Sequence, residues 1–191
     1  MKIEALIEKV DKLNRDEIRK YNPDTEFLYD VALNAGIKLA KEYGANENIV
    51  KISMALMDLK LPEASHRSIV KQHIPMALEV ANEMFKDIDC LSEYNKENII
   101  KCVEQHHGIE KYFSIESEIV ANADCYKFVH PKGTLYYSSL LGRRFHDFNK
   151  ELDQLEFKLN EKYNIISLPL VKEELDSYYT NLQKSITEAR K

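Results

Sequence analysis

Apolar side chains recur every three or four residues along most of this chain, which is the spacing of one face of an α-helix. The first stretch carries five such residues: Ile3, Leu6, Ile7, Val10 and Leu13. It predicts a helix that ends near Tyr21, because helices commonly stop shortly before a proline, here Pro23. The chain contains only 5 Gly and 5 Pro, so few residues interrupt helices. The pattern favours an all-α fold.

Two further helices are predicted after the first. The second begins at about Asp24 or Thr25 and runs to Gly44, a residue type that often follows a helix in the left-handed conformation. The third begins after Asn46, whose side chain can cap the free amides of the first turn. Its apolar face carries Asp58 to the interior. A buried carboxylate is costly without a partner or a metal ion, so Asp58 is a candidate site residue. The alternative is an exposed residue at a helix end.

The composition predicts a soluble protein with a single domain over residues 1–191. Hydrophobic residues make up 44% and charged residues 31% of the chain, proportions typical of globular domains. The formal net charge of -5 argues against general nucleic-acid binding, which favours basic proteins. Cys90, Cys102 and Cys125 form no CxxC pattern and predict reduced thiols in the cytoplasm. No stretch has the length of a signal-peptide core or a membrane span, so we expect no membrane association.

Polar residues of the kind that bind metal ions lie at the ends of predicted helices. His73 stands just before a helix that a proline opens, where the positive end of the dipole keeps the imidazole neutral and able to bind a cation. His106 and His107 end the helix at about 96–107, and His106 continues its apolar face. Each histidine could instead be a helix-terminal residue without a ligand. Asp124 lies beside the inner face of the next helix.

The order of these residues resembles the HD superfamily of metal-dependent phosphohydrolases. An AL-x-D helix end, the histidine that opens HIPMALEVA, a QHH helix end and an EIVANAD helix follow one another along the sequence. The resemblance implies an HD-domain-like helical bundle over residues 24–130, with the helices of residues 131–191 packed on it. It also implies a central divalent-metal site and hydrolysis of a phosphate ester, often of a nucleotide.

Two metal-binding positions of that family carry other residues in this sequence. The first histidine of the family falls on Phe27, and the histidine of the His-Asp dipeptide falls on Met57. A thioether is a poor ligand for hard or borderline divalent ions. The resemblance therefore leaves Asp58 and Asp124 as the catalytic carboxylates of the primary metal site.

The residues that match a second ion in two-metal members of the family are retained. They imply one divalent ion, Mn²⁺, Mg²⁺, Fe²⁺ or Zn²⁺, bound by Asp58, His73 and His106, with His107 and Asp124 beside it. The identity of the metal stays open.

Basic residues that follow Asp124 are candidates for binding a phosphate group: Lys127, Arg143 and Arg144. Arginine is suited to phosphate because its planar guanidinium donates two parallel hydrogen bonds. The alternative is a solvated helix face.

Three functions follow from these observations. The first is a phosphohydrolase that acts on a phosphorylated small molecule or nucleotide with one divalent ion. The second is an inactive HD-like module that binds such a ligand without turnover. The third is a helical domain used only for association.

Two apolar stripes near the C-terminus predict a helical hairpin. One runs from Phe145 through Phe148 to Leu159, and the other runs from Val171 to Ile186. We expect them to pack on each other and on the bundle, or across a homodimer interface.

Overall fold

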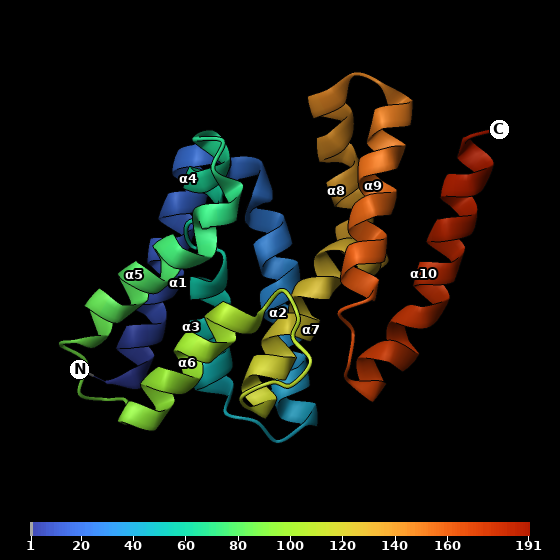
Figure 1. Ribbon diagram of the computed structural model, residues 1–191. Helices are drawn as coiled ribbons and strands as arrows, with labels where there is room; N and C mark the ends of the chain where they lie inside the picture. Colours follow the sequence, from blue (N-terminus) through green and yellow to red (C-terminus); the bar gives the residue numbers. More distant parts are fainter. Residues whose placement is uncertain (1) are drawn as a thin grey trace.

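The computed structural model describes residues 2–191, and helices make up most of this part of the chain (Figure 1). The helices are α1 (Ile3–Tyr21), α2 (Glu26–Glu42), α3 (Glu47–Met57), α4 (Leu61–His66), α5 (His73–Phe85), α6 (Glu93–Gln105), α7 (Ile115–Val129), α8 (Pro131–Phe145), α9 (Phe148–Tyr163) and α10 (Pro169–Ala189). No β-strand occurs among residues 2–191, which confirms the all-α fold. None of the helices formed by these residues has the length and apolar composition of a membrane span.

The ends of the first three helices lie close to the predicted positions. The first helix ends at Tyr21, and Gly44 follows the second with a φ of 63°. Asn46 Oδ1 accepts hydrogen bonds from the backbone amides of Asn48 and Ile49, at 3.0 and 3.4 Å. This cap fixes the start of α3, and Asp58 directly follows the last residue of that helix.

Helix α7 lies at the centre of the molecule. It packs along α2 and also contacts α3, α6, α8, α9 and α10. Because neighbours surround it, nearly every residue from Ser117 to Val129 is buried. Polar α7 side chains are therefore carried into the interior, where they need partners: Asn122, Asp124 and Lys127.

Helices α8 and α9 form an antiparallel hairpin that stands beside α2 and α7, and α10 lies on its outer side (Figure 1). The left-handed residue His146, with a φ of 50°, turns the chain between α8 and α9. The predicted stripe from Phe145 to Leu159 is therefore divided between two helices, and Phe148 is 58% exposed rather than part of the core. The buried faces of α9 and α10 pack together as predicted.

The structure also differs from the sequence prediction around α5 and α6. Helix α5 begins at His73 itself, since the residue before Pro75 adopts a helical conformation here. Helix α6 begins at Glu93 because Ser92 Oγ accepts a hydrogen bond from the Asn95 amide at 3.2 Å. The helix ends at Gln105, so both histidines of the QHH segment follow its last turn.

Candidate functional site

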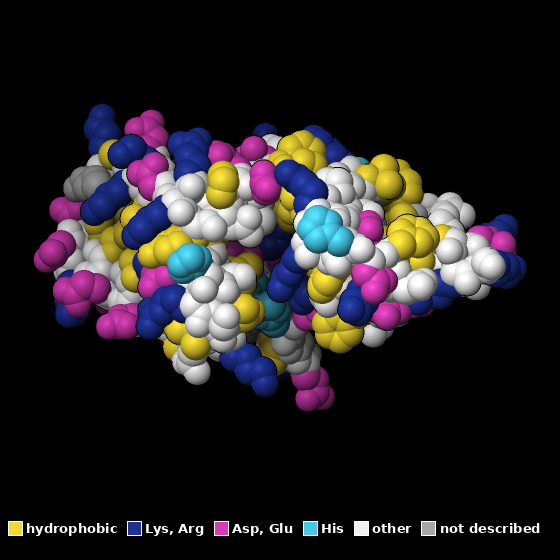
Figure 2. Space-filling model, turned by 90° about the horizontal axis from the view of Figure 1, so that it is seen from above, with side chains coloured by type: hydrophobic (Ala, Val, Ile, Leu, Met, Phe, Trp, Pro, Cys, Tyr) yellow, Lys and Arg dark blue, Asp and Glu magenta, His cyan; other side chains and the backbone are white. Residues whose placement is uncertain are grey.

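A pocket of about 320 Å³ lies between the α1–α5 part of the molecule and the α8–α9 hairpin. Figure 2 looks onto this side, where histidine, lysine and arginine side chains surround a hollow near the middle. Its acidic, basic and histidine lining residues come from separate parts of the chain: Asp58 after α3, His73 in α5, His107 after α6, Asp124 and Lys127 in α7, Arg144 in α8, and Lys158 and Lys162 in α9. Helices that are distant in the sequence therefore meet at one site.

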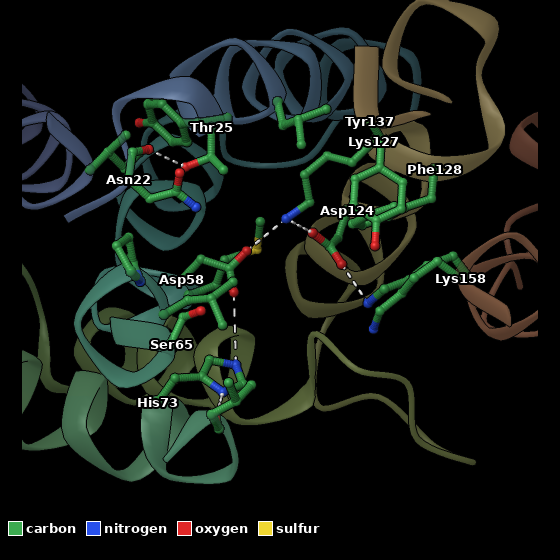
Figure 3. A pocket seen from close by; sticks show the side chains of 18 of the residues that line it. Asn22, Thr25, Asp58, Ser65, His73, Asp124, Lys127, Phe128, Tyr137 and Lys158 are labelled. Carbon is green, nitrogen blue, oxygen red and sulfur yellow. Dashed lines mark hydrogen bonds and ion pairs between the residues drawn. The ribbon is translucent and has the colours of Figure 1, made fainter. Parts of the chain in front are cut away.

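Two carboxylates face one lysine inside the pocket. Lys127 Nζ lies 2.6 Å from Asp58 Oδ2 and also contacts Asp124 Oδ1. Figure 3 shows the ammonium between the two carboxylates. Lys162 Nζ lies 2.6 Å from the other oxygen of Asp124. We call these four residues the Asp–Lys network; their two negative and two positive formal charges cancel.

The Asp–Lys network stays ionised although it is buried. Burial alone raises the pKa of Asp58 and Asp124, but the Lys127 ammonium outweighs it and holds both pKa values well below their usual range. Burial conversely lowers the pKa of Lys127 and Lys162, and the adjacent carboxylates, Asp124 above all, raise both above the usual value. Each charge therefore keeps its partner charged.

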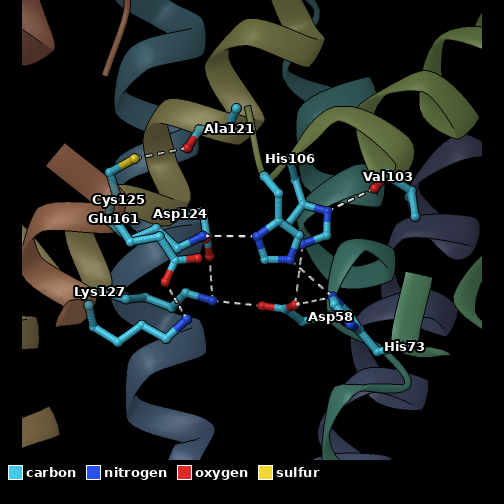
Figure 4. A network of polar contacts seen from close by, with 12 residues as sticks. Asp58, His73, Val103, His106, Ala121, Asp124, Cys125, Lys127 and Glu161 are labelled. Carbon is cyan, nitrogen blue, oxygen red and sulfur yellow. Dashed lines mark hydrogen bonds and ion pairs between the residues drawn. The ribbon is translucent and has the colours of Figure 1, made fainter. Parts of the chain in front are cut away.

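Two histidines face the other oxygen of Asp58, and a third lies beside them. His106 Nε2 lies 3.5 Å and His73 Nε2 lies 3.8 Å from Asp58 Oδ1. His107 Nε2 lies 3.2 Å from His73 Nε2, and one potential ligand atom of each ring lies within 4.8 Å of the other two. Figure 4 shows His73 and His106 directed toward Asp58. We call these three residues the histidine cluster.

Backbone carbonyls fix the orientation of two of these rings. His73 Nδ1 lies 2.7 Å from the Val70 carbonyl oxygen, and His106 Nδ1 lies 2.8 Å from that of Val103. A carbonyl only accepts, so each Nδ1 donates its hydrogen to it, and Nε2 of each ring is left facing Asp58 Oδ1. His106 is fully buried, and its Nε2 has no hydrogen-bond partner. A buried ring nitrogen that faces a carboxylate oxygen is unfavourable unless a proton on the ring or a metal ion lies between them.

His107 is the exposed member of the histidine cluster. Lys162 Nζ lies 3.3 Å from His107 Nδ1 and can donate a hydrogen bond to it. Partial loss of water around the ring lowers the pKa of His107, and the His106 ring and the Lys162 ammonium lower it further, to about 3. Burial likewise lowers the pKa of His73. Both rings are therefore neutral near pH 7, and Nε2 of His73 can bind a metal ion in that form. While His107 Nδ1 accepts from Lys162, its Nε2 carries the hydrogen and faces His73, so His107 can bind the ion through Nε2 only after it gives up the hydrogen bond from Lys162.

The histidine cluster and Asp58 Oδ1 have the spacing of metal ligands. In tetrahedral coordination with metal–nitrogen distances of about 2.0–2.1 Å, neighbouring ligand atoms lie roughly 3.3–3.4 Å apart. Three of the six separations between these four atoms are 3.2, 3.5 and 3.8 Å, and the three histidine atoms all lie within 4.8 Å of one another. Imidazole suits Zn²⁺ and Fe²⁺, and carboxylate suits Mn²⁺ and Mg²⁺. The donor set therefore fits a divalent ion of the predicted kind.

Some of the predicted site residues contact other groups in the structure than the metal ion or phosphate predicted for them. Asp124 and Lys127, predicted to bind metal and phosphate respectively, bind each other, and both oxygens of Asp124 face lysines. Arg143 pairs with the exposed Asp24 at 3.2 Å and does not line the pocket, whereas Arg144 does.

The position matched to the first histidine of the HD superfamily also needs correction. Phe27 packs against Tyr136, with ring centroids 4.5 Å apart, and is absent from the pocket wall. Its neighbour Leu28 lines the pocket instead, as does Met57. On α2, position 28 rather than position 27 therefore lines the same pocket as Asp58.

Two lysines of α9 belong to the pocket wall but were not predicted from the sequence. Lys158 and Lys162 line the pocket, and Lys162 is only 2% exposed. A signal for Lys162 was present, because it follows the core residue Leu159 by three and Leu155 by seven, the spacing of one helix face. A lysine at such a position predicts a buried acidic partner.

Comparison with known proteins identifies the fold but no family. No family model and no curated protein match the sequence. The crystal structure of Bacillus subtilis YpgQ is similar, with a TM-score of 0.68 and 14% identity over 99% of this chain and 96% of that one. A crystal structure of a Lactobacillus plantarum protein has a TM-score of 0.66 and 15% identity, covering 100% and 97%. Identities this low show a shared fold, so function has to be inferred from the site.

Proposed function

We propose that this protein is a metal-dependent hydrolase of a phosphate ester, with one divalent ion bound by the histidine cluster and Asp58. The observation that carries the proposal is the fully buried His106 Nε2, which faces Asp58 Oδ1 at 3.5 Å without a hydrogen-bond partner. The resemblance of the sequence to the HD superfamily supports the same chemistry.

The charges around the histidine cluster favour an anionic substrate. The Asp–Lys network is neutral overall, and His73 and His107 are uncharged near pH 7. A divalent ion on this side therefore keeps an uncompensated positive charge. Arg144 adds a positive side chain to the pocket wall, and Lys158 lies there as well, paired with Glu161 at 2.6 Å. A phosphate ester supplies the negative charge that this arrangement lacks.

The rest of the pocket suits an organic group attached to the phosphate. Its wall contains the aromatic side chains of Tyr29, Phe128 and Tyr137. Aromatic and apolar walls with a few charged groups are typical of small-molecule sites, and a nucleotide base would fit this pattern.

The residues of the site would divide the work of hydrolysis. A bound ion would polarise a phosphoryl oxygen and make a nearby water more acidic. His73 and His106 would hold the ion in a fixed place, because the carbonyls of Val70 and Val103 orient both rings. Arg144 and Lys158 would orient the phosphate.

One observation favours a second candidate, a module that binds a phosphorylated ligand without turnover. Lys127 contacts both Asp58 and Asp124, and the low pKa values of the two carboxylates make them weak general bases. In this second candidate, the same ion and anion bind but no proton acceptor activates the water.

Metal analysis followed by a substrate panel tests the proposal. We expect purified protein to bind one equivalent of Mn²⁺ or Zn²⁺ in calorimetric titration, and the loaded protein to release phosphate from at least one phosphate monoester or nucleotide. Saturable metal and phosphate binding without hydrolysis of any ester would support the binding module. Absence of saturable metal binding would reject both.

A further inference from the structure

The side chain of Lys127 has an unusual place between two carboxylates from different parts of the chain. Asp58 follows α3, whereas Asp124 and Lys127 lie one turn apart on α7. One ammonium contacts an oxygen of each carboxylate. Two carboxylates that share a buried site repel each other unless a cation lies between them. In this chain that cation is the ammonium group of Lys127.

The space that the ammonium takes has the donors of a divalent-cation site. Hard cations such as Mn²⁺ and Mg²⁺ prefer carboxylate oxygens supplemented by water. Asp58 Oδ2 and Asp124 Oδ1 both point at this space, and the pocket beside it has room for water. The Lys127 side chain is only 9% exposed, so it is held there by the surrounding helices.

We propose that the Lys127 ammonium is a built-in cation that takes the place of a divalent ion between Asp58 and Asp124, and thereby limits the pocket to one exchangeable ion. That this one ion binds the histidine cluster rests on the proposed function. The exclusion of an ion from the space between the carboxylates is independent of the proposed function.

If Lys127 has this role, the binding of an ion and the binding of an anion should strengthen each other. Lys127 and Lys162 already neutralise both carboxylates, so an ion on Asp58 Oδ1 gains little from their negative charge. An anion beside the ion would supply the missing charge, and by linkage each would raise the affinity of the other by the same factor. Inorganic phosphate is a suitable probe of this coupling.

Titration with Mn²⁺ alone tests the exclusion, with two matched variants. Lys127→Met removes the ammonium between the carboxylates. Lys162→Met removes an ammonium of the same charge that contacts Asp124 and His107 but not Asp58. We expect one Mn²⁺ per chain in the parent and in Lys162→Met, and one more in Lys127→Met. Without Lys127, we also expect the affinity of the first ion to rise about a hundredfold or more, because a positive charge beside it is lost.

The possible results separate this inference from the proposed function. If the parent binds no ion and Lys127→Met binds one, the histidine site is wrong but the role of Lys127 stands. If the parent binds two ions, or if Lys127→Met matches the parent in both number and affinity, the role of Lys127 is wrong. Should Lys127→Met not fold, Lys127→Gln retains the hydrogen-bond donor without the charge; the same gain is expected, and its absence would overturn the inference.

Discussion

Lys162 Nζ and Asp124 Oδ2 form an ion pair at 2.6 Å in which both side chains are only 2% exposed. The pair joins α9 to α7, the helix at the centre of the molecule. The same lysine lies 3.3 Å from His107 Nδ1, so the α8–α9 hairpin is connected to the histidine cluster as well as to the Asp–Lys network. The α8–α9 hairpin is thus part of the site.

Replacing Asp124 with alanine should therefore be strongly destabilising. The change leaves Lys127 without one of its two partners and Lys162 without its carboxylate, both in buried positions. Breaking a buried ion pair from one side costs about 3–5 kcal/mol. Urea denaturation of the metal-free protein measures the loss. Asp153→Ala, which removes an exposed partner of Arg190, is the control and should change stability little. Equal stability of the two variants would show that the network contributes nothing to folding.

The sequence predicted the histidine cluster better than the Asp–Lys network. His73 and His106 stand at helix ends that periodicity locates, and with His107 they come together in the structure. Lys162 was not predicted because a lysine on a helix usually points to solvent. Its partner Asp124 lies on a helix that is distant in the sequence. Only tertiary packing brings them together.

The turn at His146 shows another limit of sequence patterns. The spacing from Phe145 through Phe148 to Leu159 fits one helix face, yet the chain reverses between the first two. His146 adopts a left-handed conformation there, which non-glycine residues take infrequently. Asp147 then caps α9 by accepting hydrogen bonds from the Asn149 and Lys150 amides. The periodic pattern hides both features.

Substitution of His106 tests the metal site directly. His106→Gln removes the buried Nε2 atom that faces Asp58, and we expect the affinity for Mn²⁺ or Zn²⁺ to fall at least about tenfold. His66→Gln, an exposed substitution on α4, is the matched control and should bind metal like the parent. Calorimetric titration gives both affinities. Unchanged binding by His106→Gln would exclude this residue as a ligand.

The metal-free protein should lose stability as the pH falls from 7 to 5. The folded protein holds the pKa of His73 and His107 below the unfolded value of about 6.5, so the unfolded chain takes up protons first and is favoured as pH falls. The carboxylates of the Asp–Lys network, whose pKa values are lowered, contribute stability above about pH 4 and lose it only below. The loss of stability between pH 7 and 5 therefore reports on the histidines, and the loss below about pH 4 reports on the carboxylates.

Melting temperatures of the parent and His107→Gln measure the contribution of the exposed ring. The variant lacks one group with a lowered pKa, so its melting temperature should fall less steeply between pH 7 and 5. Identical slopes would mean that His107 titrates alike in both states. Saturating metal should steepen the loss in the parent, because protons compete with the ion for the histidines.

The two neighbouring arginines of α8 offer a matched test of substrate binding. Arg144 lines the pocket, whereas Arg143 pairs with Asp24 outside it. Arg144→Ala should weaken binding of a phosphorylated ligand by about 1.5–3 kcal/mol, the range for a charge-assisted hydrogen bond, and Arg143→Ala should have little effect. Titration of the metal-loaded protein with inorganic phosphate compares the two, and both variants should keep the parent's metal stoichiometry. An equal loss in the two variants would point to long-range attraction by net charge instead of a contact, and its disappearance at high salt would establish that explanation.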